Sequence, residues 1–493
     1  MRIIHKTYFA RPQSRLLFGT SVRNGWGGEF AGNMHASLGY KRMHFVGIKG
    51  AGMAALAQVV LAHGVRVSGS DTEEVFFTDE ILKRLGITVY EKFSVHHITN
   101  ELDAVVYSTA YRREAHEELV KADELQIPIF SYPEFLGKLS EQKLSIAVCG
   151  THGKTTTTAM IAHVLHLSGG EPSAIVGSSV ANWNSGALAG TGGHFVFEAD
   201  EYQNKFQYYH PWSVVLTNVG YDHGDFFPTS EKYEKAFADF TARVPKHGFL
   251  IVCADDAGAL RVTEPLASRR ITYGLHEDAQ YRAEALLRRE GSGERFRVTK
   301  DGEELGEFSI HLWGRHQIQN AAGAVAMLDT MGIAASDIEK GLADFRGTAR
   351  RMEAKGEYRG ALVFDDYAHH PEEIAATLGA AREHFSDKSI VIVFQPHTFS
   401  RTETFLDGFA RALAPADAVL LLDIYSSARE KKGSVSSDDI AERINAIHAE
   451  RAANVHTIDQ AAKLLRKSAD ENTVIITMGA GDVWQVGEAL TSE

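Results

Sequence analysis

Gly150-Thr-His-Gly-Lys-Thr-Thr-Thr-Thr158 is the stretch of this sequence that decides its fold. It follows the apolar run Leu144-Ser-Ile-Ala-Val-Cys149, which has the length and composition of a buried strand. Residues 155–168 then place apolar side chains at helical spacing. A strand, a Gly-Lys-Thr turn and a helix form a cradle for phosphate, because the glycines allow close approach, the N–H groups at the helix start face the anion and the lysine neutralises charge. The sequence therefore predicts an α/β domain that holds a nucleoside triphosphate.

The turn itself supplies the first candidate site residues. Lys154 is placed to contact the phosphates, and Thr155 to reach a Mg²⁺ ion held on them. The spacing differs from the common Walker form, whose outer glycine would fall at Val148. The alternative is a glycine turn with a solvated lysine. The predicted ATP-binding residues of the loop are Gly150, Thr151, His152, Gly153, Lys154, Thr155 and Thr156.

Length and composition limit the classes of protein that are possible. A chain of 493 residues should form two to four domains with ample core. The formal net charge of −13 argues against bulk nucleic-acid binding, so an anionic substrate needs a local basic site. No apolar run approaches the roughly 20 residues of a membrane helix. Two cysteines supply no disulfide framework, which fits a reducing cytoplasm.

The first 42 residues differ from the rest of the sequence. They hold seven basic residues against one acid, with no clear period and no signal-peptide core. They predict a disordered basic extension. The alternative is an upstream start codon, with Met34 or Met43 as the true start.

A nucleotide-binding βαβ unit is expected after this segment. His44-Phe-Val-Gly-Ile-Lys-Gly-Ala-Gly-Met53 reads as a strand and a glycine turn, followed by a helix over 54–63 and a strand that ends at Asp71. A dinucleotide fingerprint requires glycine where this chain has Lys49, so a phosphate partner other than NAD is suggested. Asp71 is placed to bind a ribose hydroxyl, with a helix N-cap as the alternative. This domain is predicted to span residues 43–141.

The second predicted domain, residues 142–349, brings acids to the ends of strands. The strand from His194 ends in Glu198, Asp200 and Glu201, and a second strand from Pro211 runs into Tyr221-Asp-His223. Glu198 is the candidate Mg²⁺ ligand and His223 the candidate ligand of a second metal. Asp200 and Glu201 have loop capping as the alternative.

Two further patterns in this domain predict structure alone. Polar and apolar residues alternate on either side of Asp301-Gly302, and this pattern predicts a small antiparallel β insertion between Ala279 and Gly314. Ser336-x-x-Glu339 predicts a capping box at the start of a helix.

The third predicted domain, residues 350–493, again alternates strands and helices. Polar residues follow three of its strands, in Asp365-Asp-Tyr-Ala-His-His-Pro371, in Gln395-Pro-His397 with Arg401 beyond it, and in Gly479-Ala-Gly-Asp482. Pro371 is expected in the first turn of a helix. Three such strand ends together indicate a site.

In combination these motifs resemble the Mur ligases, a family of ATP-dependent, amide-bond-forming enzymes of peptidoglycan synthesis, and the match runs from about Met43 to the C-terminus. It rests on His44-Phe-Val-Gly-Ile-x-Gly, Ser68-Gly-Ser-Asp71, Gly150-Thr-His-Gly-Lys-Thr-Thr, Glu198-Ala-Asp-Glu, Asp222-His223, Gly314-Arg-His, Asp365-Asp-Tyr-x-His-His-Pro371 and Met478-Gly-Ala-Gly-Asp482. The resemblance implies three α/β domains: a Rossmann-like domain for a UDP-sugar, a P-loop ATPase domain, and a Rossmann-like domain for an amino acid.

The resemblance also implies roles for single residues. Lys154 would hold the β- and γ-phosphates, with metal ions on Thr155, Glu198 and His223. His316 and Asn320 match the adenine-contacting segment, although Gln317 stands where the family usually has Asn. Arg351 matches the arginine that reaches the phosphates from the third domain, Asp366 matches the acid beside it, and His369 lies in the same family loop. Those expected to be catalytic are Lys154, Glu198, His223, Arg351, Asp366 and His369.

Two substrate sites are implied in the same way. Arg401 and His397 would meet the amino-acid carboxylate, and Thr398 stands where some members carry a further arginine. Lys49 replaces a glycine that many members have. The residues implied to bind the UDP-sugar are Gly47, Lys49, Gly50, Gly52, Asp71, Ser108 and Thr109.

The implied reaction joins L-alanine to the lactyl carboxylate of UDP-N-acetylmuramate through an acyl phosphate, with ATP and Mg²⁺, in a cytoplasmic monomer or homodimer. Small molecules are the expected partners, with neither nucleic acid nor membrane. One alternative is the recycling reaction that attaches an intact tripeptide, which Glu201-Tyr202 and Asp225-Phe-Phe-Pro228 favour and Phe394-Gln-Pro-His397 opposes. More distant alternatives are a nicotinamide-dependent oxidoreductase and a non-catalytic UDP-sugar-binding protein.

Overall fold

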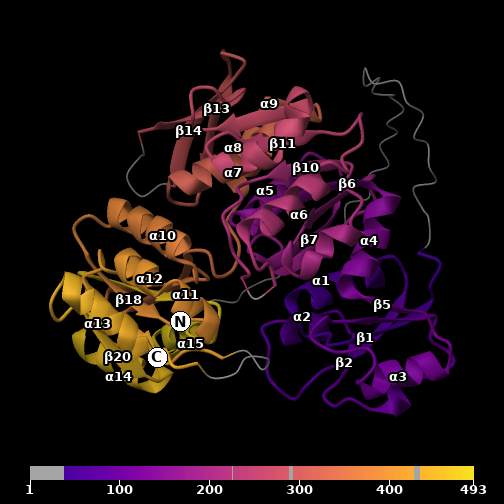
Figure 1. The fold of residues 1–493 in the computed structure, drawn as a ribbon, viewed down its shortest axis with the longest axis horizontal. Coiled ribbons are helices and arrows are strands. Elements are labelled where there is room, and N and C mark those ends of the chain that lie inside the picture. Colours follow the sequence, from indigo (N-terminus) through magenta and orange to yellow (C-terminus); the bar gives the residue numbers. More distant parts are fainter. Residues whose placement is uncertain (1–37, 225, 288–292, 427–432, 493) are drawn as a thin grey trace, which may run out of the picture. The chain divides into compact units, whose positions relative to one another are not determined.

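The computed structural model describes residues 38–224, 226–287, 293–426 and 433–492 (Figure 1). Most of the predicted N-terminal extension and Asp225 lie outside these ranges. The described residues form three β-sheets, each flanked by helices, and the predicted α/β fold is confirmed. None of the described helices has both the length and the apolar character needed to cross a bilayer.

The N-terminal sheet is parallel throughout and has the order β3-β2-β1-β4-β5. The predicted βαβ unit is confirmed: a buried strand, a glycine turn and a helix bring the chain to Asp71 at the carboxyl end of β2. The strands are β1 (Arg42–Val46), β2 (Arg66–Ser70), β3 (Thr88–Tyr90), β4 (Ala104–Tyr107) and β5 (Ile129–Ser131). The helices are α1 (Ala51–Ala62), α2 (Asp79–Arg84), α3 (Glu117–Glu124) and α4 (Tyr132–Gln142).

The central sheet has ten strands in the order β15-β14-β13-β12-β11-β10-β6-β9-β7-β8. Its parallel centre is covered on both faces, since Ile146 and Val148 of β6 belong to one apolar cluster and Ala147 and Cys149 to another. The strands are β6 (Leu144–Cys149), β7 (Ser173–Val180), β8 (Ser185–Ala189), β9 (His194–Glu198), β10 (Ser213–Leu216), β11 (Leu250–Cys253), β12 (Arg270–Gly274), β13 (Tyr281–Leu286), β14 (Glu294–Lys300) and β15 (Glu303–Ile310). The α-helices are α5 (Lys154–Leu167), α6 (Ser230–Thr241), α7 (Ala257–Val262), α8 (Arg315–Thr330) and α9 (Ala335–Asp344).

The two structural predictions for this region had different outcomes. The antiparallel strands β13–β15 are present, and Asp301 and Gly302 form the hairpin turn with φ of 50° and 87°. These strands extend the central sheet at its edge. The predicted capping box is wrong: α9 begins at Ala335 after Ala334, and Ser336 lies inside the helix. The helix starts earlier because the Ala334 carbonyl already accepts the N–H groups of Asp337 and Ile338.

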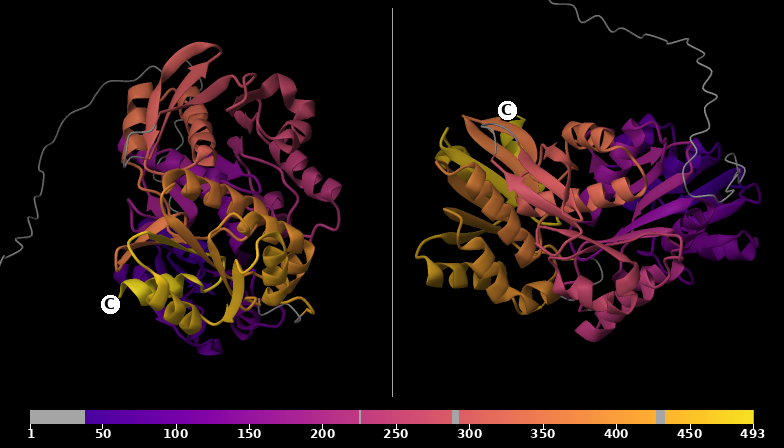
Figure 2. Two further views of the ribbon diagram at one scale, coloured as in Figure 1. Left: turned by 90° about the vertical axis from the view of Figure 1, so that its left-hand side faces the viewer. Right: turned by 90° about the horizontal axis from the view of Figure 1, so that it is seen from above.

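The C-terminal sheet has the order β16-β17-β21-β18-β19-β20, and only β16 is antiparallel to its neighbour. Pro371 is the first residue of α10, as predicted. The strands are β16 (Glu353–Tyr358), β17 (Ala361–Asp366), β18 (Ser389–Phe394), β19 (Ala418–Leu422), β20 (Ala452–His456) and β21 (Thr473–Met478). The helices, several of which are visible in the orange and yellow parts of Figures 1 and 2, are α10 (Pro371–His384), α11 (Phe399–Thr404), α12 (Leu406–Leu413), α13 (Ser437–Ile447), α14 (Ile458–Ser468) and α15 (Trp484–Thr491).

Candidate active site

The Gly150–Lys154 turn joins β6 to α5 in a conformation that requires glycine. Gly150 has a φ of 140° and Gly153 a φ of 81°, and a Cβ at either position would collide with Thr217 or Asn320. Neighbouring groups fix the turn: the Thr217 hydroxyl donates to the His152 carbonyl at 2.6 Å, and the His152 N–H donates to Asn218 Oδ1 at 2.9 Å. The turn is therefore fixed in place before the N-terminus of α5, and helix N-termini of this kind favour the binding of phosphate groups.

Lys154 lies across this turn. Its Nζ donates to the carbonyls of Gly150 at 2.6 Å and Thr151 at 3.1 Å, and it forms an ion pair with Glu201 Oε2 at 3.1 Å. Burial alone lowers the pKa of Lys154, but the carboxylates of Glu201, Asp200 and Glu198 outweigh it and hold the pKa above its ordinary value. The lysine is therefore a permanent positive charge beside the loop.

Thr155 and Glu198 meet where α5 begins and β9 ends. The Thr155 hydroxyl donates to Glu198 Oε2 at 2.9 Å, and the Gly177 N–H on β7 donates to the same oxygen at 3.0 Å. A hydroxyl and a carboxylate at the edge of a phosphate loop are oxygen donors of the kind that Mg²⁺ prefers. The fold therefore brings together the two residues predicted to share a magnesium ion.

Asp200, Glu201 and His223 form a second group of potential metal ligands, with donor atoms within 4.8 Å of one another. His223 Nε2 lies 3.6 Å from Glu201 Oε1, on backbone with a φ of 56°. Burial raises the pKa of Glu201 against the opposing effect of Lys154. Glu201 thus touches both Lys154 and His223, although the sequence pattern was equally consistent with loop capping. In the sequence, the position of Glu201 close to the candidate ligand Glu198 was the only indication that Glu201 belongs to the site.

Arg351, Asp366 and His369 gather at the carboxyl end of β17. Asp366 accepts the N–H groups of Met352 and Ala368, both at 2.8 Å. Burial raises the pKa of Asp366 to about 6, against the lowering effect of Arg351. The His369 ring donates through Nδ1 to the Tyr367 carbonyl at 2.9 Å, and burial lowers its pKa to about 3.

Glu373, on the first turn of α10, is a site residue that the sequence reasoning missed. Its Oε1 lies 3.6 Å from Arg351 Nη1 and 3.1 Å from His152 Nδ1, and its Oε2 accepts the His369 N–H at 3.1 Å. Burial opposes the charge on His152, but Glu372 and Glu373 outweigh it and raise the His152 pKa to about 9. Glu373 is therefore the shared partner of three predicted site residues.

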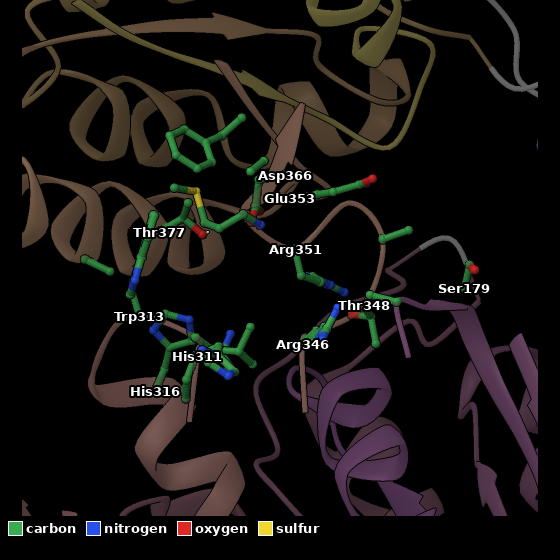
Figure 3. A pocket seen from close by; sticks show the side chains of 18 of the residues that line it. Ser179, His311, Trp313, His316, Arg346, Thr348, Arg351, Glu353, Asp366 and Thr377 are labelled. Atoms are coloured by element: carbon green, nitrogen blue, oxygen red, sulfur yellow. Dashed lines mark hydrogen bonds between the residues drawn. The ribbon is translucent and has the colours of Figure 1, made fainter. Parts of the chain in front are cut away.

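A cavity of about 490 Å³ lies between the start of α8, residues 346–354 and the β17–α10 region (Figure 3). Its volume is in the range of small-molecule sites. Of the predicted ATP-binding residues, His316, Arg351 and Asp366 line it. Asn320 is not among the lining residues and instead donates to Gln317 Oε1 at 3.1 Å. Gln317, from the segment that matches the family's adenine contact, lines it as well. Trp313, Arg346 and Thr348 also line the cavity and carry no motif that sequence reasoning could have used.

The residues implied for the UDP-sugar lie around the carboxyl ends of β1, β2 and β4. Gly47 has a φ of 81°, and a Cβ there would come within 2.9 Å of the Ser108 side chain. Asp71 Oδ2 accepts the Lys49 N–H at 2.7 Å, so it braces the glycine turn and caps no helix. The Lys49 side chain is 2% exposed, and its Nζ bonds to the Glu74 carbonyl and lies 3.4 Å from Asp79 Oδ1.

Arg401 faces an acid of the central region. Its Nη2 lies 3.3 Å from Asp222 Oδ1, and the guanidinium holds the Asp222 pKa below its ordinary value even though burial raises it. His397 stacks on Tyr425 with ring centroids 5.7 Å apart, and its ring lies 6.3 Å from that of His369. In the structure, Arg401 therefore already pairs with a carboxylate, that of Asp222.

Comparison with known proteins agrees with this arrangement. Three family models match in order: the Mur ligase family catalytic domain over residues 42–144, the Mur ligase middle domain over 148–328, and the Mur ligase glutamate ligase domain over 350–481. The chain is 41% identical to the UDP-N-acetylmuramate–L-alanine ligase of Desulfitobacterium hafniense, covering 91% of this chain and 99% of the relative.

Solved structures give the same result. The UDP-N-acetylmuramate–alanine ligase of Thermotoga maritima matches with a TM-score of 0.77 and 28% identity, over 92% of this chain and 98% of that one. A murein peptide ligase of Psychrobacter arcticus shares the fold, with a TM-score of 0.66 and 24% identity over 92% of this chain and 98% of that one. The chain belongs to the Mur ligase family.

Proposed function

We propose that this chain is an ATP-dependent ligase that joins L-alanine to the lactyl carboxylate of UDP-N-acetylmuramate in the synthesis of peptidoglycan precursors. The observation that carries the proposal is 41% identity over nearly the whole chain to a relative of that name. The tripeptide-adding alternative is less favoured, because the murein peptide ligase is only 24% identical and supports the fold alone. The oxidoreductase and sugar-sensor alternatives leave the Lys154, Glu198 and Glu201 arrangement without a role.

We assign the UDP-sugar to residues 43–141, ATP to residues 142–349 and the amino acid to residues 350–493. In the first step a lactyl carboxylate oxygen attacks the γ-phosphorus of ATP, the bond to the β-phosphate oxygen breaks, and ADP leaves. Lys154 is placed to neutralise the phosphates at the start of α5, and Arg351 to approach them from the cavity wall. Positioning and charge stabilisation supply most of the rate in such reactions.

Mg²⁺ fits the donor atoms of the central region. Thr155 and Glu198 offer oxygen donors 2.9 Å apart, and His223 with Glu201 offers a neighbouring pair. The ion, when bound, would neutralise phosphate charge. The protein's own contribution is to orient these donors: Gly177 holds one Glu198 oxygen, and Tyr233 donates to Glu201 Oε1 at 3.1 Å.

In the second step the neutral amine of alanine attacks the acyl carbon, and the tetrahedral intermediate expels phosphate to leave an amide. Arg401 is the group assigned to the alanine carboxylate, which would take the place that Asp222 has on the guanidinium. Because His369 donates through Nδ1 to the Tyr367 carbonyl, its Nε2 keeps a lone pair that can accept a hydrogen bond from the amine.

Phosphate release with ATP, Mg²⁺ and UDP-N-acetylmuramate tests the proposal. We expect turnover that depends on L-alanine and is absent when the murein tripeptide replaces it. Activity with the tripeptide alone would establish the recycling reaction instead. Binding of NAD without hydrolysis of ATP would contradict the whole assignment.

A further inference from the structure

His152, His370 and Glu372 form a cluster to which the mechanism above gives no role as a group. His152 belongs to the phosphate loop, whereas His370 and Glu372 lie at the start of α10. Each offers one donor atom, and these atoms lie within 4.8 Å of one another. The rings of the two histidines are 5.2 Å apart between centroids.

The His152 ring is oriented by an acid and leaves one nitrogen available. Its Nδ1 lies 3.1 Å from Glu373 Oε1, which fixes the ring. Its Nε2 is buried, lies 3.5 Å from Glu372 Oε2, and makes no hydrogen bond within the described ranges. A carboxylate that holds one ring nitrogen while the other faces a cluster of donors is the arrangement that orients metal-binding histidines.

His370 also presents a buried nitrogen without a partner. The residue is 6% exposed, and its Nε2 makes no hydrogen bond to any residue that the structure describes. Its Nδ1 accepts only a long contact of 3.4 Å from the Glu372 N–H. Buried polar atoms are normally paired, so the unpaired Nε2 of His370, next to the His152–Glu372 ion pair, calls for a ligand.

We propose that His152, His370 and Glu372 bind a divalent transition-metal ion of the Zn²⁺ class. Two imidazoles and a carboxylate suit Zn²⁺ and leave the fourth coordination position of the ion open. Mg²⁺, in contrast, takes oxygen ligands. Zn–N and Zn–O bonds of about 2.0–2.2 Å place tetrahedral donors roughly 3.4 Å apart. The 3.5 Å between His152 and Glu372 already meets this distance. Glu372 can adjust, because its side chain is 70% exposed.

Three costs oppose the ion. The first is the loss of the Nε2 proton of His152, because Glu372 and Glu373 raise the pKa of that ring to about 9. Binding through Nε2 of His370 moves that ring's proton to Nδ1 and gives up the long contact with the Glu372 N–H. The partial positive charge at the start of α10 disfavours a cation, but Glu372 and Glu373 supply two negative charges there. The site is distinct from the Thr155–Glu198 pair, which has no imidazole.

An ion at this position ties the phosphate loop to α10. Because His152 lies in the loop that we assign to ATP, occupancy should slow turnover. This consequence for turnover rests on the proposed function, whereas metal binding itself does not.

Metal binding to the full chain tests the proposal. Protein stripped with a chelator is titrated with Co²⁺, whose visible absorption reports nitrogen ligation, and then with Zn²⁺ in competition, with excess Mg²⁺ throughout. The variants are His370→Gln and Glu372→Gln, and Glu383→Gln, exposed on the same helix, is the matched control. We expect a high-affinity site that weakens at least about tenfold in both variants and is unchanged in the control, separate from any ion on Asp200, Glu201 and His223, which both variants keep.

Three outcomes would overturn the proposal: no Co²⁺ or Zn²⁺ site in the parent, the same number and affinity of sites in both variants as in the parent, or equal loss in the control. Because Glu372 is exposed, Glu372→Gln tests the site even if His370→Gln fails to fold. Zn²⁺ should also slow phosphate release in the parent more than in Glu372→Gln. If the protein lacks ligase activity, the Co²⁺ titration still decides whether the metal site exists.

Discussion

At the scale of single residues, Lys154 is the charge on which the assignment of the phosphate loop depends. Its ammonium lies among the loop carbonyls and Glu201, and replacing it by alanine removes that charge from the start of α5. We expect Lys154→Ala to lower kcat about 10²–10³-fold, the usual cost of losing one preorganised electrostatic contact. Phosphate release measures this effect. Lys235→Ala, on an exposed ion pair of α6, should leave turnover unchanged. Full turnover by Lys154→Ala would remove the loop from the mechanism.

Asp366 gives the site a pH dependence whose sign can be worked out. Burial raises its pKa to about 6, so the carboxyl is protonated below that pH and ionised above it. The ionised form is the better acceptor for the N–H groups of Met352 and Ala368, which position Arg351. We expect kcat/KM to fall as the pH drops below about 6.

The control for this pH dependence is Asp366→Asn, which keeps the shape of the side chain and removes its charge. The variant should be slower at neutral pH and should lose the acidic limb of the pH profile. An acidic limb that persists unchanged in Asp366→Asn would assign it to another group.

At the scale of secondary-structure elements, β7 holds the carboxylate of Glu198, the proposed Mg²⁺ ligand, through Gly177. A Cβ at this position would lie 2.5 Å from Glu198 Oε2, so alanine must push the end of that flexible side chain aside. We expect Gly177→Ala to fold normally but to need more Mg²⁺ for half-maximal turnover. Gly193→Ala, where an added Cβ meets no atom within 4 Å, is the matched control. An unchanged Mg²⁺ requirement in Gly177→Ala would contradict the role given to Glu198.

Elements with a strong pattern of their own were predictable from sequence. The apolar run of β6 was placed at its observed bounds, because the strand is buried over almost its whole length. Strand β16, which is largely exposed, and the short strand β20 were not predicted, because neither contains a run of apolar residues that stands out in the sequence. The β7–β8 hairpin was missed for the same reason, and with it the Gly177 contact.

The candidate site was predictable only where a motif marks it. The phosphate loop and the acids that end β9 lie beside recognisable turns, so their residues could be named. Glu373 and the cavity residues Trp313 and Arg346 belong to no motif, and their proximity arises from tertiary packing alone. Lys49 shows the reverse, since its charge suggested a phosphate contact but its ammonium is engaged by Glu74 and Asp79.

At the scale of the whole molecule, the segment that leads into the C-terminal sheet is hydrogen-bonded to the central sheet and the residues after β7. The Ala349 N–H donates to the Ser179 carbonyl at 2.7 Å, and the Ala181 N–H donates to the Gly347 carbonyl at 3.0 Å. Directly after these bonds, Arg350 and Met352 adopt φ of 60° and 47°, which few non-glycine residues do. The segment therefore has a fixed end beside β7 and a sharp bend where the next sheet begins.

This geometry predicts how the two chemical steps separate. Lys154 begins α5 of the central region and Arg401 lies on α11 after β18, so we expect them to serve different steps. If Arg401 binds the alanine carboxylate, Arg401→Ala should raise the KM for L-alanine about tenfold to a hundredfold, the range for losing a hydrogen bond to a charged group. Acyl-phosphate formation, measured by trapping with hydroxylamine in the absence of alanine, should persist because it needs no amino acid.

Lys154→Ala should show the opposite pattern and slow trapping by the same roughly 10²–10³-fold, because the first step is impaired. Arg411→Ala, an exposed cation on α12, controls for the loss of positive charge and should leave both steps intact. Loss of trapping in Arg401→Ala would mean that Arg401 acts in the first step, through Asp222 and the neighbouring His223. The ratio of trapped acyl phosphate to amide therefore distinguishes an arginine that receives the second substrate from one that organises the metal site.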